Sequence, residues 1–181
     1  DAKRADSTYP FDELSGCGVG FKLIQAYAKT YGIAFESLYK YLDLVTISIA
    51  SDIVPIIGEN RILAHFGLKL INTNPRPGIE SILRVANIIR KPESEIEKNG
   101  DEMGLLFNRE LTISDMVFVV GPRINAAGRI ESGRNSVKLL ISPDREAAAS
   151  IAHTINDLNT ERRTLDTQIT QEALDIIEHD E

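Results

Sequence analysis

One long hydrophobic pattern near the end of the chain limits the folds open to it. Between Ala147 and Ile176, apolar residues recur at steps of three or four with charged residues between them, and no Gly or Pro follows Pro143. At about 1.5 Å per residue, this pattern predicts a helix on the order of 50 Å long. Arg162 interrupts the apolar seam near its middle. A helix of this length with one narrow seam is either a coiled-coil arm or a strut that joins two bodies.

Composition limits the classes of function. The 181 residues suffice for one sizeable core, and 43% hydrophobic with 26% charged residues is typical of a globular protein. The net charge of −7 argues against a protein that coats nucleic acid with its whole surface, so such contact would need a local basic patch or a metal ion. Cys17 is the only cysteine, which excludes intramolecular disulfides and fits a reducing cytoplasm. No apolar run approaches the roughly 20 residues of a membrane span, so no membrane contact is expected.

The remaining hydrophobic patterns predict mostly helices. Ser15 is the expected N-cap of a helix whose glycine-rich start either approaches a phosphate or packs closely against a neighbour. Over residues 35–57 a buried strand competes with a helix that ends near Asp52, and we favour the helix because Pro55 prevents its continuation. Thr112 and Asp115 have the spacing of a capping box. Further helices are expected over residues 61–71, 79–89, 113–120 and 136–141, and the charged segment 91–106 is expected to be exposed.

The polar segment 121–133, GPRINAAGRIESG, lies between two apolar runs. It holds two arginines, an asparagine and three glycines, a composition suited to bringing backbone close to an anion. We interpret it as a phosphate-handling loop, although the local sequence fits an arginine-capped helix linker equally well. Asp52 lies in an otherwise apolar stretch and needs a partner there, which could be a backbone cap, an arginine or a metal ion.

Several segments together resemble a known family. YPFDELSGCGVGFKL, YLDLVTISIASDIVPIIGENRIL, RPGI and FVVGPRINAAGRI, followed by the long helix, are similar in kind and order to the RecJ single-stranded-DNA-specific exonucleases of the DHH phosphoesterase superfamily. The resemblance implies a mainly α fold: the helical part of an α/β DHH phosphoesterase core and a long connecting helix, with at most one or two short strands. Residues 1–142 would be the C-terminal helical portion of the catalytic domain, and 143–181 an interdomain helix that leads to a missing second domain.

The resemblance also implies an activity and its residues. It implies a metal-dependent exodeoxyribonuclease that hydrolyses single-stranded DNA from the 5′ end in DNA repair and recombination. Asp52 falls in the stretch similar to the family's fourth motif and would be a catalytic ligand of Mn²⁺ or Mg²⁺, although Ser48-Ile49 replaces the usual Gly-Thr pair. Arg123 and Arg129 would bind a DNA phosphate, presented by a loop because they are too far apart for one helix face, and Asn125 would donate a hydrogen bond or fix the loop. Supporting roles are expected for Ser15, Gly16, Gly18, Arg61 and Arg76.

The chain departs from the family in lacking the DxD-type aspartates and the Asp-His-His triplet. Its three histidines, His65, His153 and His179, are not adjacent. A single aspartate is a poor site for a cation that needs several oxygen ligands, so we expect a fragment of a cytoplasmic enzyme that neither holds a metal tightly nor hydrolyses DNA by itself. Expected partners are single-stranded DNA, a single-stranded-DNA-binding protein and a helicase, and exposed apolar faces favour self-association. The alternatives are another DHH-type oligonucleotide or cyclic-dinucleotide phosphodiesterase, or a non-enzymatic helical interaction module.

Overall fold

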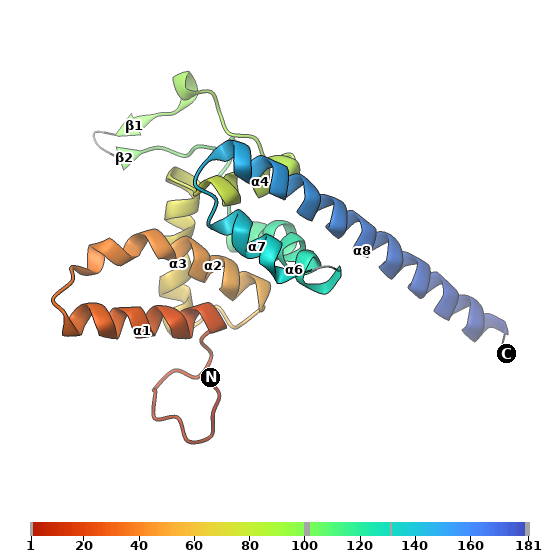
Figure 1. Cartoon of the computed structure of the whole chain (residues 1–181), viewed down its shortest axis with the longest axis horizontal. Coiled ribbons are helices and arrows are strands. Elements are labelled where there is room, and N and C mark those ends of the chain that lie inside the picture. The colour runs from red at the N-terminus through yellow and green to blue at the C-terminus, as the bar shows by residue number, and fades with distance from the viewer. Residues whose placement is uncertain (1, 100–101, 131, 180–181) are drawn as a thin grey trace.

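The computed structural model describes residues 2–99, 102–130 and 132–179, and within them the chain is mainly helical (Figure 1). The helices are α1 (Gly16–Thr30), α2 (Leu42–Ser51), α3 (Gly58–Thr73), α4 (Pro77–Val85), α5 (Ile113–Asp115), α6 (Gly121–Ile130), α7 (Gly133–Leu140) and α8 (Arg145–His179). Short 3-10 helices η1 (Phe35–Tyr41) and η2 (Glu93–Glu95) and a π-helical turn η3 (Met116–Val120) complete the helical elements. The strands β1 (Lys98–Asn99) and β2 (Glu102–Met103) pair antiparallel. The predicted mainly α fold with at most two short strands is confirmed.

The start of α1 has the cap that the sequence predicts. The buried Ser15 hydroxyl accepts a hydrogen bond of 3.2 Å from the backbone N–H of Gly18. A side chain at Gly18 would meet that hydroxyl at 3.3 Å, so this glycine serves close packing. Across the interface, the N–H of Cys17 lies 3.4 Å from the Ser48 hydroxyl of α2. The first turn of α1 is therefore fixed against α2.

Helix α2 lies at the centre of the body, and most of its residues are buried. It ends at Ser51, with Asp52 as its C-cap residue, so the helical interpretation of this stretch is confirmed over the strand. Asp43 in its first turn is 1% exposed and forms a bidentate ion pair with Arg76, with N–O distances of 2.6 and 2.7 Å. Burial of this carboxylate is possible because the guanidinium neutralises it and satisfies both oxygens.

The prediction of a loop over residues 121–133 is wrong for residues 121–130, which form α6. The chain runs from α5 through η3 into α6 without leaving a helical path. Pro122 would break an ordinary helix, because its ring clashes with the carbonyl one turn before it. Here the preceding turn is wide, since the N–H of Gly121 bonds to the carbonyl of Met116, five residues earlier. The π-helical turn thus lets the helix continue across the Gly-Pro pair.

Helix α8 is the long helix that the hydrophobic pattern predicts. Its first half packs on α4 and α6 and contributes Ala148, Ala152 and Ile155 to the main hydrophobic core. Its second half extends beyond the body in Figure 1, and Ile169 and Ile176 on it are more than 60% exposed. The first half of α8 is therefore part of the helical body, and the division of the chain at residue 142 stays a prediction. No helix in the described residues is long and apolar enough to cross a membrane.

Candidate functional site

A pocket of about 250 Å³ lies where the C-terminal end of α2 meets η3, α6 and α8. Its lining includes Ser51 and Ile53 from the α2 turn, Asn125 and Arg129 from α6, and Arg162 from α8. The side-chain amide of Asn125 donates a hydrogen bond of 3.2 Å to the carbonyl of Ser51. This bond joins two segments that are 74 residues apart in the sequence. It holds the segment that contains Asp52 against the helix that contains the arginines.

Asp52 is exposed, and Ser51 and Ile53 on either side of it line the pocket. Its carboxylate accepts a hydrogen bond of 3.2 Å from the Ser48 hydroxyl. A negative charge at a helix C-terminus meets the unfavourable end of the helix dipole, so Asp52 is not placed to stabilise α2. The role of Asp52 as a metal ligand stays a prediction. The described residues contain no group of three or more His, Cys, Asp and Glu that could hold a metal ion.

The two predicted phosphate-binding arginines lie on α6 but point in different directions. They are six residues apart, which places them about 120° apart around the helix axis. Arg123 is half-buried and donates to the Asn156 side chain of α8 at 3.0 Å and to the carbonyl of Val119 at 2.8 Å. Arg129 is exposed and lines the pocket. A helix therefore presents both arginines, not a loop, and of the two only Arg129 lines the pocket.

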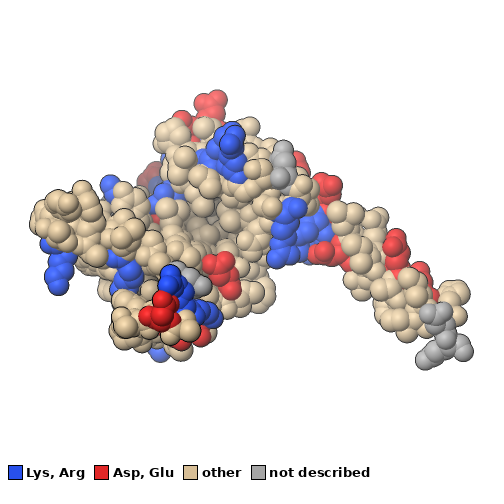
Figure 2. Space-filling view, turned by 60° about the horizontal axis from the view of Figure 1, so that its bottom comes forward, with Lys and Arg blue, Asp and Glu red and all other residues tan. Residues whose placement is uncertain are grey.

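Arginine side chains converge where α6 meets α8. Burial lowers the pKa of Arg123 below its ordinary value, and the positive charge of Arg163 lowers this pKa further. Arg129 of α6 and Arg162 of α8 line the pocket. Figure 2 shows basic side chains gathered on the body where α8 leaves it. The chain thus has a local concentration of positive charge despite its net charge of −7.

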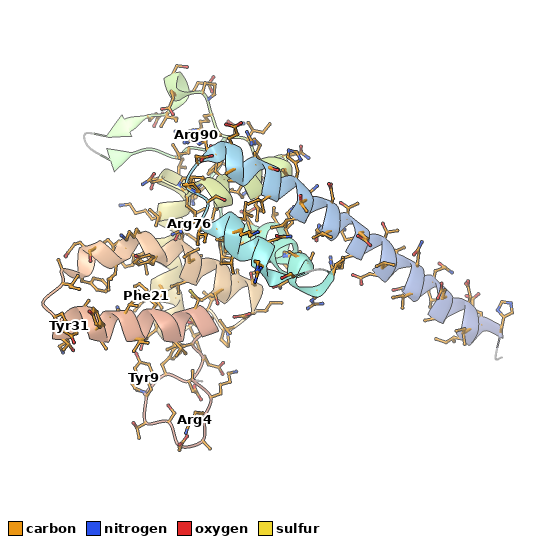
Figure 3. The ribbon with its side chains drawn as sticks, in the orientation of Figure 1. Arg4, Tyr9, Phe21, Tyr31, Arg76 and Arg90 are labelled. Carbon is orange, nitrogen blue, oxygen red and sulfur yellow. The ribbon has the colours of Figure 1, made fainter. Side chains whose placement is uncertain are left out.

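The five residues expected to support the site lie elsewhere. Arg76 is among the helices at the centre of the body (Figure 3), where it pairs with Asp43 and donates to the carbonyls of Lys40 and Leu140. These contacts show that the Arg76 guanidinium stabilises the packing of the helices, and its expected supporting role at the site stays a prediction. Ser15 and Gly18 likewise form the start of α1. Neither Gly16 nor the exposed Arg61 lines the pocket.

Sequence patterns did not reveal three of the pocket residues, Ser51, Ile53 and Arg162. The one available signal was the interruption of the apolar seam by Arg162. A charged residue on the apolar side of a helix that packs against a body needs a polar environment there. Ser51 and Ile53 carry no such signal, because a serine and an isoleucine at a helix end are ordinary in sequence.

Comparison with known proteins gives a consistent set of relatives. No protein-family model matches the chain. The single-stranded-DNA-specific exonuclease RecJ of Bacillus subtilis is 33% identical over 176 residues, which are 97% of this chain and 19% of that protein. The Escherichia coli protein of the same name is 32% identical over 183 residues, covering 96% of this chain and 29% of the relative. The chain thus spans about a fifth to under a third of the length of these curated relatives.

Solved structures agree in fold. A crystal structure of exonuclease RecJ bound to manganese superposes with a TM-score of 0.72 at 23% identity, covering 91% of this chain and 37% of that one. RecJ from Thermus thermophilus in complex with Mg²⁺ gives a TM-score of 0.69 at 24% identity, covering 88% of this chain and 22% of that one. Sequence identity and fold together identify the chain as a RecJ-type sequence that corresponds to one helical segment of those longer proteins.

Proposed function

We propose that this chain is the helical part of a metal-dependent exodeoxyribonuclease that hydrolyses single-stranded DNA from its 5′ end, for DNA repair and recombination. The curated relatives carry the name single-stranded-DNA-specific exonuclease, and solved RecJ structures contain Mg²⁺ or Mn²⁺. In this proposal residues 1–142 complete the catalytic domain, and residues 143–181 connect it to a second domain. The observation that carries the proposal is the bond from Asn125 to Ser51, because it holds the Asp52 turn beside the arginine-bearing helix.

Each site residue has a role that follows from its surroundings. Asp52 supplies one exposed carboxylate, which fits one coordination position of a hard divalent cation but not a complete site. The remaining ligands must come from outside the described residues, so the chain alone neither retains the metal nor hydrolyses DNA. When bound, such an ion neutralises charge on the phosphate under attack. Arg129 binds phosphate oxygens, Asn125 holds α6 against α2, and Arg123 holds α6 against α8.

The decisive experiment compares Asp52→Asn with the unsubstituted protein in a RecJ-length enzyme that contains this segment. We expect hydrolysis of a 5′-labelled single-stranded oligonucleotide with Mn²⁺ to fall by at least about 100-fold, because the substitution removes a charged ligand but keeps the side chain's shape. Binding of the oligonucleotide without metal should change little. The matched control is Asp12→Asn, which removes an equal charge from an exposed position much earlier in the sequence than Asp52. Full hydrolysis by the Asp52→Asn enzyme would refute the metal role.

A binding experiment tests whether Arg129 binds DNA phosphate. Arg129→Gln in the 181-residue chain should weaken salt-dependent binding of single-stranded DNA, measured by fluorescence anisotropy. Arg134→Gln, also exposed but not part of the pocket lining, is its control. Equal effects of the two substitutions would mean that Arg129 acts only through net charge.

We also propose a cytoplasmic location and protein partners for the whole enzyme, namely a single-stranded-DNA-binding protein and a helicase.

A non-enzymatic interaction module is the second candidate function, and the exposed apolar residues on the second half of α8 favour it. A second copy of the chain would cover this face in such a module. Analytical sedimentation distinguishes the interaction module from the nuclease segment. A module would dimerise as the protein concentration rises and would not bind single-stranded DNA.

A further inference from the structure

Two buried polar atoms at the pocket are left without a hydrogen-bond partner among the described residues. They are the Ser51 hydroxyl oxygen and Nε of Arg162, and both residues line the same pocket. Folded proteins rarely leave such atoms unsatisfied, because burial removes their hydrogen bonds to water and gives none in return. The guanidinium N–H and the hydroxyl are two donors from residues that line one pocket, and a ligand with several acceptor oxygens would satisfy both.

The turn beside these atoms is strained. Ile53 has a φ of 52°, in the left-handed region that a β-branched residue seldom adopts. The N–H groups of Ile53 and Val54 bond back to the carbonyls of Ala50 and Ile49, at 3.4 and 3.3 Å, which is the usual closing motif of a helix. That motif normally has glycine where Ile53 stands. The Ile53 side chain is 75% exposed, so burial does not compensate for the strain. Uncompensated strain of this kind is concentrated at binding and catalytic sites.

The charges at the pocket select an anion. Arg162 is 28% exposed, and its Nη1 donates to Asp166 at 2.8 Å, an exposed pair one turn along α8 that orients the guanidinium. Its Nε remains for a second acceptor. Arg129 adds a second guanidinium at the same pocket. At about 250 Å³ the pocket is smaller than the roughly 300 to 1,000 Å³ typical of small-molecule sites, so it fits a phosphate group better than a whole nucleotide.

We propose that this pocket binds one phosphodiester group of single-stranded DNA, with Arg162 and Ser51 as binding residues in addition to Arg129. The Arg162 and Arg129 guanidinium groups donate to the non-bridging oxygens, and the Ser51 hydroxyl donates to the same phosphate. The ligand would bridge α2, α6 and α8 at the point beyond which α8 is exposed. This inference rests on the proposed function, since it names a further subsite for the same substrate.

The test uses Arg162→Gln and its sequence neighbour Arg163→Gln as a matched pair in the 181-residue chain. Both remove one positive charge from the same turn of α8, but only Arg162 lines the pocket. We expect Arg162→Gln to weaken binding of a fluorescein-labelled oligothymidylate at least about tenfold, as loss of a charge-assisted hydrogen bond does, and Arg163→Gln to weaken it by less than about threefold. Equal losses would overturn the proposal, because they would report net charge and not a pocket.

Ser51→Ala provides a second test that does not depend on charge. It removes an unsatisfied buried hydroxyl, so the thermal midpoint should stay unchanged or rise while oligothymidylate binding weakens about threefold or more. A residue that serves only the fold would not separate stability from binding in this way. Unchanged binding by Ser51→Ala would contradict its assignment.

Two further outcomes separate this subsite from the proposed function. Titration with inorganic phosphate, followed by NMR, tests the shared chemistry: a pocket that binds phosphate but leaves the oligothymidylate affinity insensitive to Arg162→Gln would overturn the phosphodiester assignment. If a RecJ-length enzyme loses hydrolysis with Asp52→Asn but binds DNA equally well with and without Arg162→Gln, the subsite is refuted and the proposed function stands. If Arg162→Gln weakens binding while Asp52→Asn leaves hydrolysis intact, the subsite is supported and the metal role of Asp52 fails.

Discussion

Replacing Gly67 by alanine should destabilise the protein although alanine is the better helix former. Gly67 lies within α3 where this helix packs against α2. A Cβ added there would lie 2.3 Å from the carbonyl oxygen of Leu42 and 2.0 Å from the Thr46 hydroxyl. Ordinary contact begins at 3.4 Å, so relief from the Leu42 carbonyl alone needs 3.4 − 2.3 = 1.1 Å of separation. The obstacle is backbone, which a side-chain rotation cannot remove.

The expected magnitude follows from two opposing contributions. Overpacking of this kind costs about 3 kcal/mol, at the upper end of the usual range, because two helices must move apart. The gain in helix propensity from Gly to Ala offsets about 1 kcal/mol of this cost. The free energy of unfolding should therefore fall by about 2 kcal/mol, which for a domain of this size lowers the thermal midpoint by roughly 4 to 8 °C.

Gly20→Ala is the matched control. Gly20 is exposed within α1, and no atom lies within 4 Å of an added Cβ. This variant keeps only the propensity gain and should be more stable by about 0.5 to 1 kcal/mol. Urea unfolding followed by circular dichroism measures both variants. A Gly67→Ala protein as stable as the parent, or a Gly20→Ala protein destabilised to the same extent, would show that the α2–α3 contact does not exclude a side chain.

Two further predictions concern ion pairs. Arg76→Ala should reduce the free energy of unfolding by about 3 to 5 kcal/mol, because it leaves the buried Asp43 carboxylate unpaired. The control variant Arg84→Ala, at an exposed position, should change this free energy little. Similar losses of stability for both variants in thermal unfolding would contradict the structural role of Arg76. The hydrogen bond from Arg109 lowers the pKa of Asp115 to about 2, below its ordinary value of 3.8, so this stabilisation is complete above about pH 4 and is lost as the pH falls through about 2. Near neutral pH, Asp115→Asn should be less stable than the parent by at most about 2 kcal/mol, because Arg109 is exposed and solvent weakens the ion pair. Urea unfolding should show this difference shrinking as the pH falls from about 4 to about 2. A difference that does not change with pH would refute the contribution of the Arg109–Asp115 pair.

Local patterns in the sequence were sufficient for the elements whose signals are local. The length of α8 follows from an apolar period without helix breakers, and the Ser15 cap and the Thr112–Asp115 capping box follow from side chains that bond backbone groups three residues away. The similarity of the GPRINAAGR segment and its neighbours to RecJ proteins also needed no coordinates. The caps and the length of α8 depend on residues within one segment, whereas the similarity to RecJ proteins depends on the order of several segments along the chain.

Tertiary structure decided what depends on partners far away in the sequence. Residues 121–130 are a helix and not a loop because η3 accommodates Pro122 and because α6 is held by Ser51 on one side and Asn156 on the other. The pairing of Arg76 with Asp43, the strained φ of Ile53 and the convergence of Ser51 with Arg162 likewise depend on how the helices pack. The sequence by itself therefore determined the similarity to RecJ and the local helices. The packing of α2, α6 and α8 decided which polar groups share a pocket, because the composition of the pocket depends on contacts between distant segments, which no local pattern encodes.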